Sequence, residues 1–176
     1  MKTNIALIGF MGTGKTAVGR LLAKKLDKQF IELDELIARK AGQPIPEIFR
    51  REGETGFREL EIETTREVAG RKNTVIACGG GIVLNKINID RLREECVIVC
   101  LTASPEVILK RTSGDKDSRP LLAVDDRSRQ IKELLQYRKP YYERAADIIV
   151  NTSRLKTEAV VERIIEKLRK HEGYRS

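Results

Sequence analysis

Aromatic residues and histidine are scarce in this chain. Its 176 residues include four tyrosines, four phenylalanines and no tryptophan, which leaves little surface for stacking on nucleic-acid bases. The single histidine, His171, stands in a polar tail. One histidine so placed argues against a Ser-His-Asp triad and against a zinc site built on histidine.

Cysteine is scarce as well, and long apolar runs are missing. Cys78, Cys96 and Cys100 are odd in number and lack CxxC spacing, which argues against a disulfide framework and favours a reduced, cytoplasmic setting. No apolar run approaches the ~18 residues that a membrane-spanning helix requires, so we expect no membrane partner.

The charges form no block of one sign. The net charge is +8, but the lysines and arginines are spread along the chain among 26 acidic residues. Such a surplus suits a site that takes polyanionic substrates. Without a basic cluster it gives no reason to expect nucleic acid as a partner.

A glycine loop near the start organises the sequence. Residues 9–16 read GFMGTGKT and match the pattern GxxxxGK[ST] at every fixed position. An apolar segment at 4–8 fits a buried parallel strand, and the apolar positions of 18–26 fall on one face of a helix. Strand, loop and helix in this order predict phosphate binding by backbone N–H groups at a helix N-terminus.

Two side chains of this loop carry the chemistry. Lys15 supplies a cation for the β- and γ-phosphates of a nucleotide, and the hydroxyl of Thr16 can bind Mg²⁺. The loop therefore predicts that the protein binds a nucleoside triphosphate.

Acidic residues end the next predicted strand, at 29–34. Ligands of open α/β sheets bind outside the carboxyl ends of the strands, which favours a role in the site for Glu32 and Asp34. The pattern is equally typical of a solvated strand end, with Asp34 as the N-cap of the helix that follows. On this segment alone, both alternatives stay open.

Two arginines stand where a charge needs a partner. Arg58 begins a helix predicted at 57–69, with Glu61 three positions on, where a carboxylate can hold the guanidinium. Arg138 falls on the apolar side of a helix that begins near residue 126, which favours an ion pair or an anionic ligand. Pro140 should kink or end that helix.

Three glycines, Gly79, Gly80 and Gly81, follow a third predicted strand at 74–78. They can form a plain loop or admit a ligand close to the backbone. The aspartate that often follows such a strand and helps to hold Mg²⁺ is missing, so that role passes to Glu32 or Asp34.

A polar segment at 112–120, which contains Arg119, lies between two predicted helices. We favour a lid that excludes water during phosphoryl transfer over a plain linker. Apolar strands at 96–101 and 147–150 and a last helix near 161–168 complete an α/β domain, with a five-stranded parallel sheet between helices.

Taken together, these segments resemble the shikimate kinase family. The likeness covers nearly the whole chain and rests on six segments in order, GFMGTGKT, FIELDELI, GETGFRELE, CGGG, RTSGDKDSRPLL and YRKPYYERA. It implies a single P-loop kinase domain over residues 1–176, with strand order 2-3-1-4-5, substrate-binding helices near 34–70 and a lid near 112–125. It also implies transfer of the ATP γ-phosphate to the 3-hydroxyl of shikimate, in aromatic amino-acid biosynthesis, by an enzyme that we expect to be monomeric.

The resemblance also assigns roles to residues. It implies catalytic roles for Lys15, Asp34 and Arg119, and it implies that Asp34 contacts the hydroxyl that is phosphorylated. Shikimate binding falls on Asp34, Arg58, Gly79, Gly80, Gly81 and Arg138, where two guanidinium groups suit the carboxylate of the substrate. Nucleotide binding falls on Gly12, Thr13, Gly14, Lys15, Thr16, Ala17, Arg111, Arg119 and Arg154. Mg²⁺ falls to Thr16.

One residue departs from the family pattern, which often has Asp-x-Asp where this chain has Glu32 and Asp34. A contact from Glu32 to Mg²⁺ through a water is therefore an open alternative. A small P-loop kinase acting on gluconate or a nucleoside monophosphate is the competing function. The absence of DxxG and NKxD argues against a GTP-driven switch.

Overall fold

A computed structural model describes residues 1–113 and 126–175 of the chain. Its five strands are β1 (Asn4–Ile8), β2 (Gln29–Glu32), β3 (Thr74–Ala77), β4 (Cys96–Thr102) and β5 (Ile148–Asn151). They form one sheet of order β2-β3-β1-β4-β5, and every neighbouring pair is parallel. The fold class and the strand order implied by the resemblance are both confirmed.

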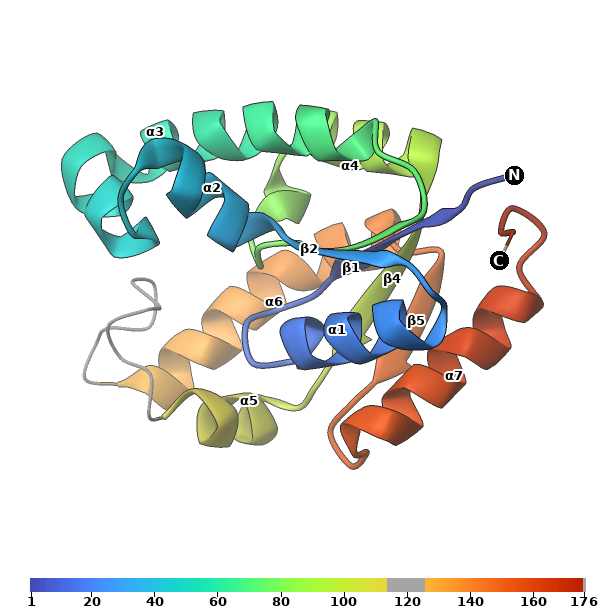
Figure 1. Cartoon of the computed structure of the whole chain (residues 1–176). Coiled ribbons are helices and arrows are strands. Elements are labelled where there is room, and N and C mark those ends of the chain that lie inside the picture. Colours follow the sequence, from blue (N-terminus) through green and yellow to red (C-terminus); the bar gives the residue numbers. More distant parts are fainter. Residues whose placement is uncertain (114–125, 176) are drawn as a thin grey trace.

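Helices cover both faces of this sheet (Figure 1). They are α1 (Lys15–Lys25), α2 (Leu33–Ala41), α3 (Ile45–Ala69), α4 (Lys86–Glu95), α5 (Pro105–Thr112), α6 (Arg127–Ala145) and α7 (Thr157–Arg169), with a short 3₁₀ helix, η1 (Ile82–Leu84). Apolar side chains of α1 and α7 pack on one face, and those of α3, α4 and α6 pack on the other. Among the described residues, no helix is both long and apolar enough to cross a membrane.

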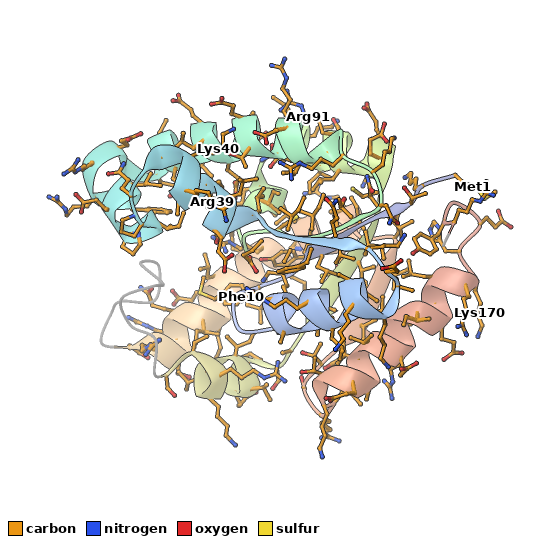
Figure 2. The ribbon with its side chains drawn as sticks, viewed as in Figure 1. Met1, Phe10, Arg39, Lys40, Arg91 and Lys170 are labelled. Atoms are coloured by element: carbon orange, nitrogen blue, oxygen red, sulfur yellow. The ribbon has the colours of Figure 1, made fainter. Side chains whose placement is uncertain are left out.

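The alternation of side chains along the central strand builds both cores. Ile5 and Leu7 of β1 point to the layer of α1 and α7, whereas Ala6 and Ile8 point to the opposite layer. A strand buried on both faces must be apolar at every position, which explains the uninterrupted run that the sequence shows. Figure 2 shows side chains filling the space between the sheet and its two helical layers, with Met1 and Lys170 at the periphery.

The carboxyl ends of the strands meet at one edge of the sheet. In register, Ile8 of β1 stands beside Cys100 of β4, and Glu32 of β2 stands beside Ala77 of β3. The loops that leave these strand ends therefore converge, and they include the phosphate loop and the three-glycine segment. This edge is where an open α/β sheet binds its ligands.

The structure excludes two local alternatives, a cap role for Asp34 and an end of the helix at Pro140. β2 ends at Glu32, which takes the N-cap position of α2 without a side-chain cap bond, so Asp34 lies in the first helical turn and is not the cap. Likewise, α6 continues past Pro140 to Ala145. Proline removes one backbone hydrogen bond. Burial of Tyr142 and Ala145 beyond it holds the last turns against the sheet.

Candidate active site

A cavity of about 460 Å³ opens at the carboxyl edge of the sheet. Its walls come from the phosphate loop, the start of α2, the three-glycine segment, and one residue each of α5 and α6. Residues of α3 on both sides of Gly53, where a φ of 71° interrupts the helix, complete them. The lining residues are Met11, Gly12, Gly14, Lys15, Thr16, Ala17, Glu32, Asp34, Ile45, Phe49, Phe57, Arg58, Glu61, Cys78, Gly79, Gly80, Gly81, Arg111 and Arg138.

The phosphate loop delivers the N-terminus of α1 to this cavity. Gly14 stands just before the helix with φ of 97°, a left-handed conformation that favours glycine. The first turn of α1 contains no acidic residue, so its free N–H groups and the positive end of the helix dipole are open to an anion.

Lys15 lies folded over the loop. Its Nζ donates hydrogen bonds to the carbonyl oxygens of Gly9 at 2.7 Å and Phe10 at 2.9 Å. Loss of hydration in the cavity lowers the pKa of Lys15 to about 8, and the nearby carboxylates of Asp34 and Glu32 oppose that shift. Lys15 therefore remains largely cationic at neutral pH and can exchange its carbonyl partners for phosphate oxygens.

Thr16 and Glu32 form a pair of oxygen donors beside the loop. The hydroxyl of Thr16 donates to Oε2 of Glu32 at 2.6 Å. Burial raises the pKa of Glu32, and the bond from Thr16 opposes that rise. No group of three or more His, Cys, Asp or Glu side chains suited to a metal occurs within the described residues. Mg²⁺ fits this arrangement, because it binds through one or two protein oxygens together with phosphates.

On the other side of the cavity, Arg58 is held by carboxylates of its own helix. Its Nη1 donates to Oε1 of Glu61 at 2.9 Å, and its Nη2 reaches Glu54 at 3.2 Å. Glu61 is fully buried, which raises its pKa to about 7 against the opposing charge of Arg58. These bonds aim the guanidinium at the three-glycine segment, where a Cβ on Gly81 would come within 2.7 Å of Cζ of Arg58.

Arg138 reaches the cavity from α6. It is only 2% exposed, and its Cζ lies 5.8 Å from the centroid of the Phe10 ring. Its Nε and Nη1 have no hydrogen-bond partner among the residues that the structure describes. A buried guanidinium with free donors is costly unless an anion completes it. The prediction that Arg138 lies on the inward side of its helix is confirmed.

Asp34 lies between the two halves of the cavity. Its Oδ1 is buried and lacks a hydrogen-bond partner among the described residues. Burial raises the pKa of Asp34, while the charges of Lys15 and Arg58 oppose the rise. A Cβ on Gly79 would lie 2.9 Å from this Oδ1 and 3.2 Å from Oε2 of Glu61, so only glycine admits both carboxyls here. The carboxylate of Asp34 is therefore free to accept a hydrogen bond from a ligand hydroxyl.

Most of the predicted site residues line this cavity, and among the described residues two do not. Thr13 is buried behind the loop, and its hydroxyl donates to the Phe10 carbonyl oxygen at 2.8 Å. Arg154 is exposed and does not line the cavity. Arg119 and the predicted lid, beyond residue 113, lie outside the described residues.

The cavity also contains residues that the sequence did not single out as site residues. Phe49 and Phe57 stack in its wall with their ring centroids 4.8 Å apart. In the sequence both look like ordinary core residues of a helix, so nothing marked them as site residues. Glu61 was predicted only as a partner of Arg58, and its three-residue spacing gave no sign that its second oxygen would face the cavity.

The sequence and the fold of this chain are both similar to those of known proteins. The family model named SKI, shikimate kinase, matches residues 11–169. A shikimate kinase of Thermodesulfovibrio yellowstonii is 48% identical over 93% of this chain and 94% of its own length. The structure of a shikimate kinase from Acinetobacter baumannii in complex with shikimate superposes with a TM-score of 0.94 at 37% identity, covering 98% of this chain and 96% of that one. A shikimate kinase from Aquifex aeolicus gives a TM-score of 0.82 at 36% identity, covering 94% and 96%.

Proposed function

The chain belongs to the shikimate kinase family, and from that premise we propose that it transfers the γ-phosphate of ATP to the 3-hydroxyl of shikimate. The enzyme is an ATP-dependent phosphotransferase with an alcohol acceptor, and its product is shikimate 3-phosphate. The reaction belongs to aromatic amino-acid biosynthesis.

The observation that carries this proposal is the meeting of two different anion sites in one cavity. One is the phosphate loop with Lys15, and the other is the pair of guanidinium groups of Arg58 and Arg138. A guanidinium fork binds a planar carboxylate through two parallel hydrogen bonds, which the single ammonium group of a lysine cannot do. An acceptor that bears one carboxylate and several hydroxyls therefore fits the second site, which favours shikimate or gluconate over a nucleoside monophosphate. Membership of the shikimate kinase family favours shikimate over gluconate.

In the nucleotide half of the cavity, ATP binds at the phosphate loop. We assign the phosphates to Gly12, Thr13, Gly14, Lys15, Thr16 and Ala17, and the adenine side to Arg111 and Arg154 by resemblance to the family. Thr16, and Glu32 through a water, would hold Mg²⁺. When bound there, Mg²⁺ neutralises charge on the β- and γ-phosphates. Arg119, outside the described residues, is assigned to the transferred phosphate on the resemblance alone, as is the lid near 112–125.

In the substrate half, Asp34 performs the proton chemistry. The 3-hydroxyl oxygen bonds to the γ-phosphorus, the bond from that phosphorus to the bridging oxygen of ADP breaks, and the hydroxyl proton passes to the carboxylate of Asp34. The raised pKa of Asp34 makes it a better proton acceptor than an exposed aspartate. Gly79, Gly80 and Gly81 let the substrate approach the backbone, and Lys15 stabilises the charge that develops on the phosphates.

Acceptor specificity tests the proposal. Initial rates of ADP formation are measured with shikimate, gluconate, AMP and CMP at equal concentrations, in the presence of Mg²⁺. The proposal predicts turnover with shikimate that exceeds the others by at least about 10²-fold, since a reacting hydroxyl misplaced by about 1 Å costs roughly that factor. Turnover of gluconate or a monophosphate at a rate equal to that of shikimate would overturn it.

We further propose that the enzyme works as a monomer in the cytoplasm. Its three cysteines, Cys78, Cys96 and Cys100, are free and buried, so none of them forms a disulfide that would require an oxidising compartment. Light scattering of the purified protein tests the oligomeric state.

A further inference from the structure

Thr152 connects the phosphate loop to the ends of β4 and β5. It follows β5 directly and is only 2% exposed. Its backbone N–H donates to the carbonyl oxygen of Thr102 at 2.8 Å, which fixes its position beside β4. Its hydroxyl lies 2.9 Å from the carbonyl oxygen of Thr13, 139 positions away in the chain.

The hydroxyl of Thr152 can donate only one hydrogen bond. Two carbonyl oxygens are within reach, Thr13 at 2.9 Å and Thr102 at 3.1 Å. The carbonyl oxygen of Thr13 is the closer of the two, so the hydroxyl proton is assigned to Thr13. The lone pairs of the same oxygen accept from Nη1 of Arg111 at 3.0 Å.

Arg111, at the end of α5, completes a small network. Its Nη2 donates to the carbonyl oxygen of Thr152 at 3.0 Å, and its Nη1 also reaches that of Gly12 at 3.1 Å. Two consecutive carbonyls of the phosphate loop, those of Gly12 and Thr13, are therefore held from behind by Arg111 and Thr152. Neither carbonyl can turn toward a bound phosphate without breaking these bonds.

Because a peptide unit is planar, fixing the Thr13 carbonyl also fixes the direction of the Gly14 N–H, on the cavity side of the loop. All peptide bonds described in the chain are trans, so each N–H points opposite to the carbonyl of its own peptide unit. Holding the Thr13 carbonyl toward Thr152 therefore directs the Gly14 N–H away from Thr152. Gly14 lines the cavity. An N–H that points away from Thr152 can therefore serve as a donor to a phosphate bound there.

We propose that Thr152 is a positioning residue for nucleotide binding: its hydroxyl holds the Thr13 carbonyl and the Arg111 guanidinium together and thereby presets the N–H of Gly14 toward the phosphates. The inference rests on the proposed binding of a nucleoside triphosphate at this loop. Thr152 does not line the cavity, and its hydroxyl contacts only Arg111 and carbonyl oxygens beside the phosphate loop, so its effect should be confined to the nucleotide half of the site.

Thr152→Val and Thr152→Ser separate the hydroxyl from the shape of the side chain. If only about one molecule in ten keeps the loop in the competent orientation without the hydroxyl, the dissociation constant of Mg-ADP increases about tenfold. Calorimetric titration should therefore show about tenfold weaker ADP binding by Thr152→Val, rescue by Thr152→Ser, and an unchanged dissociation constant for shikimate. Thr74→Val is the matched control, because Thr74 is also fully buried and its hydroxyl has no partner among the described residues.

Each alternative result is distinct. ADP binding by Thr152→Val equal to that of the wild type would overturn the inference, and so would equal losses for ADP and shikimate, which indicate a general structural defect. If Thr152→Val does not fold, Thr152→Ala takes its place, with the same expected loss and the same rescue by serine. A wild-type protein that fails to bind Mg-ADP at all would contradict the proposed function, and this inference with it.

Discussion

Arg58 donates to one oxygen of Glu61 at 2.9 Å, whereas the second oxygen of Glu61, also buried, has no hydrogen-bond partner among the described residues. This half-satisfied carboxyl stands behind the site proposed for the shikimate carboxylate. It holds the guanidinium of Arg58 in place, and it carries a pKa raised to about 7 by burial. Its protonation state thus changes within the physiological range.

Glu61 should make stability depend on pH. Its pKa is about 7 in the folded protein and 4.5 when unperturbed, so the folded state binds more protons between these values. The stabilisation is fully present below the lower value and is lost as pH rises through about 7. Between pH 5 and pH 8 the wild type should lose on the order of 2 kcal/mol of unfolding free energy relative to Glu61→Gln, from the linkage of about 1.36 kcal/mol per pKa unit.

Urea unfolding of both proteins across this pH range measures that difference. Glu63→Gln, at an exposed position of the same helix, is the matched control and should follow the wild type. Parallel pH profiles for the wild type and Glu61→Gln would contradict the assignment of a raised pKa to Glu61.

Patterns that depend on neighbouring residues could be predicted from the sequence. The apolar run of β1, the glycine loop and the inward position of Arg138 all follow from local periodicity or spacing. Contacts between segments that are distant in the sequence could not be predicted in this way. The bond from Thr152 to Thr13 depends on how β5 and the phosphate loop meet in space, and no local pattern marks it. The path of α6 past Pro140 likewise depends on tertiary burial, which overrides local propensity.

Lys15→Ala should weaken nucleotide binding and nearly abolish turnover. Lys15 is the side-chain cation of the loop, and loss of one charged group that stabilises a transition state typically costs roughly 10²–10³ in kcat. Initial rates and ADP titration measure the two effects. Lys24→Ala, at an exposed position of the same helix, is the control. Retained ATP affinity together with normal kcat would remove Lys15 from the site.

Arg58→Lys should raise the KM for shikimate and leave the KM for ATP unchanged. The substitution keeps the positive charge but loses the planar fork, and loss of one bidentate contact of roughly 1.5–3 kcal/mol corresponds to an increase in KM of about 10–150-fold. The exposed Arg66→Lys on the same helix provides the control for steady-state kinetics. An increase in the ATP KM alone would assign Arg58 to the nucleotide side.

Asp34→Asn should lower kcat by roughly 10² or more, the scale typical of a positioned base. Nucleotide affinity should change little. Because burial raises the pKa of Asp34, removal of its charge should not lower the melting temperature at pH 8. Rapid-quench kinetics and thermal melts measure the two effects. Normal turnover with a lower melting temperature would mean that Asp34 stabilises the fold and does not act on the substrate.

The position of the transferred phosphate tests the central claim most directly. Shikimate, ATP and Mg²⁺ are incubated with the wild type and with Asp34→Asn, and the products are identified by ³¹P–¹H correlation NMR. The account predicts shikimate 3-phosphate as the only phosphorylated product of the wild type, with at least about 10²-fold less from the variant in the same time. Phosphate on a different hydroxyl, or equal amounts of the 3-phosphate from both proteins, would contradict it.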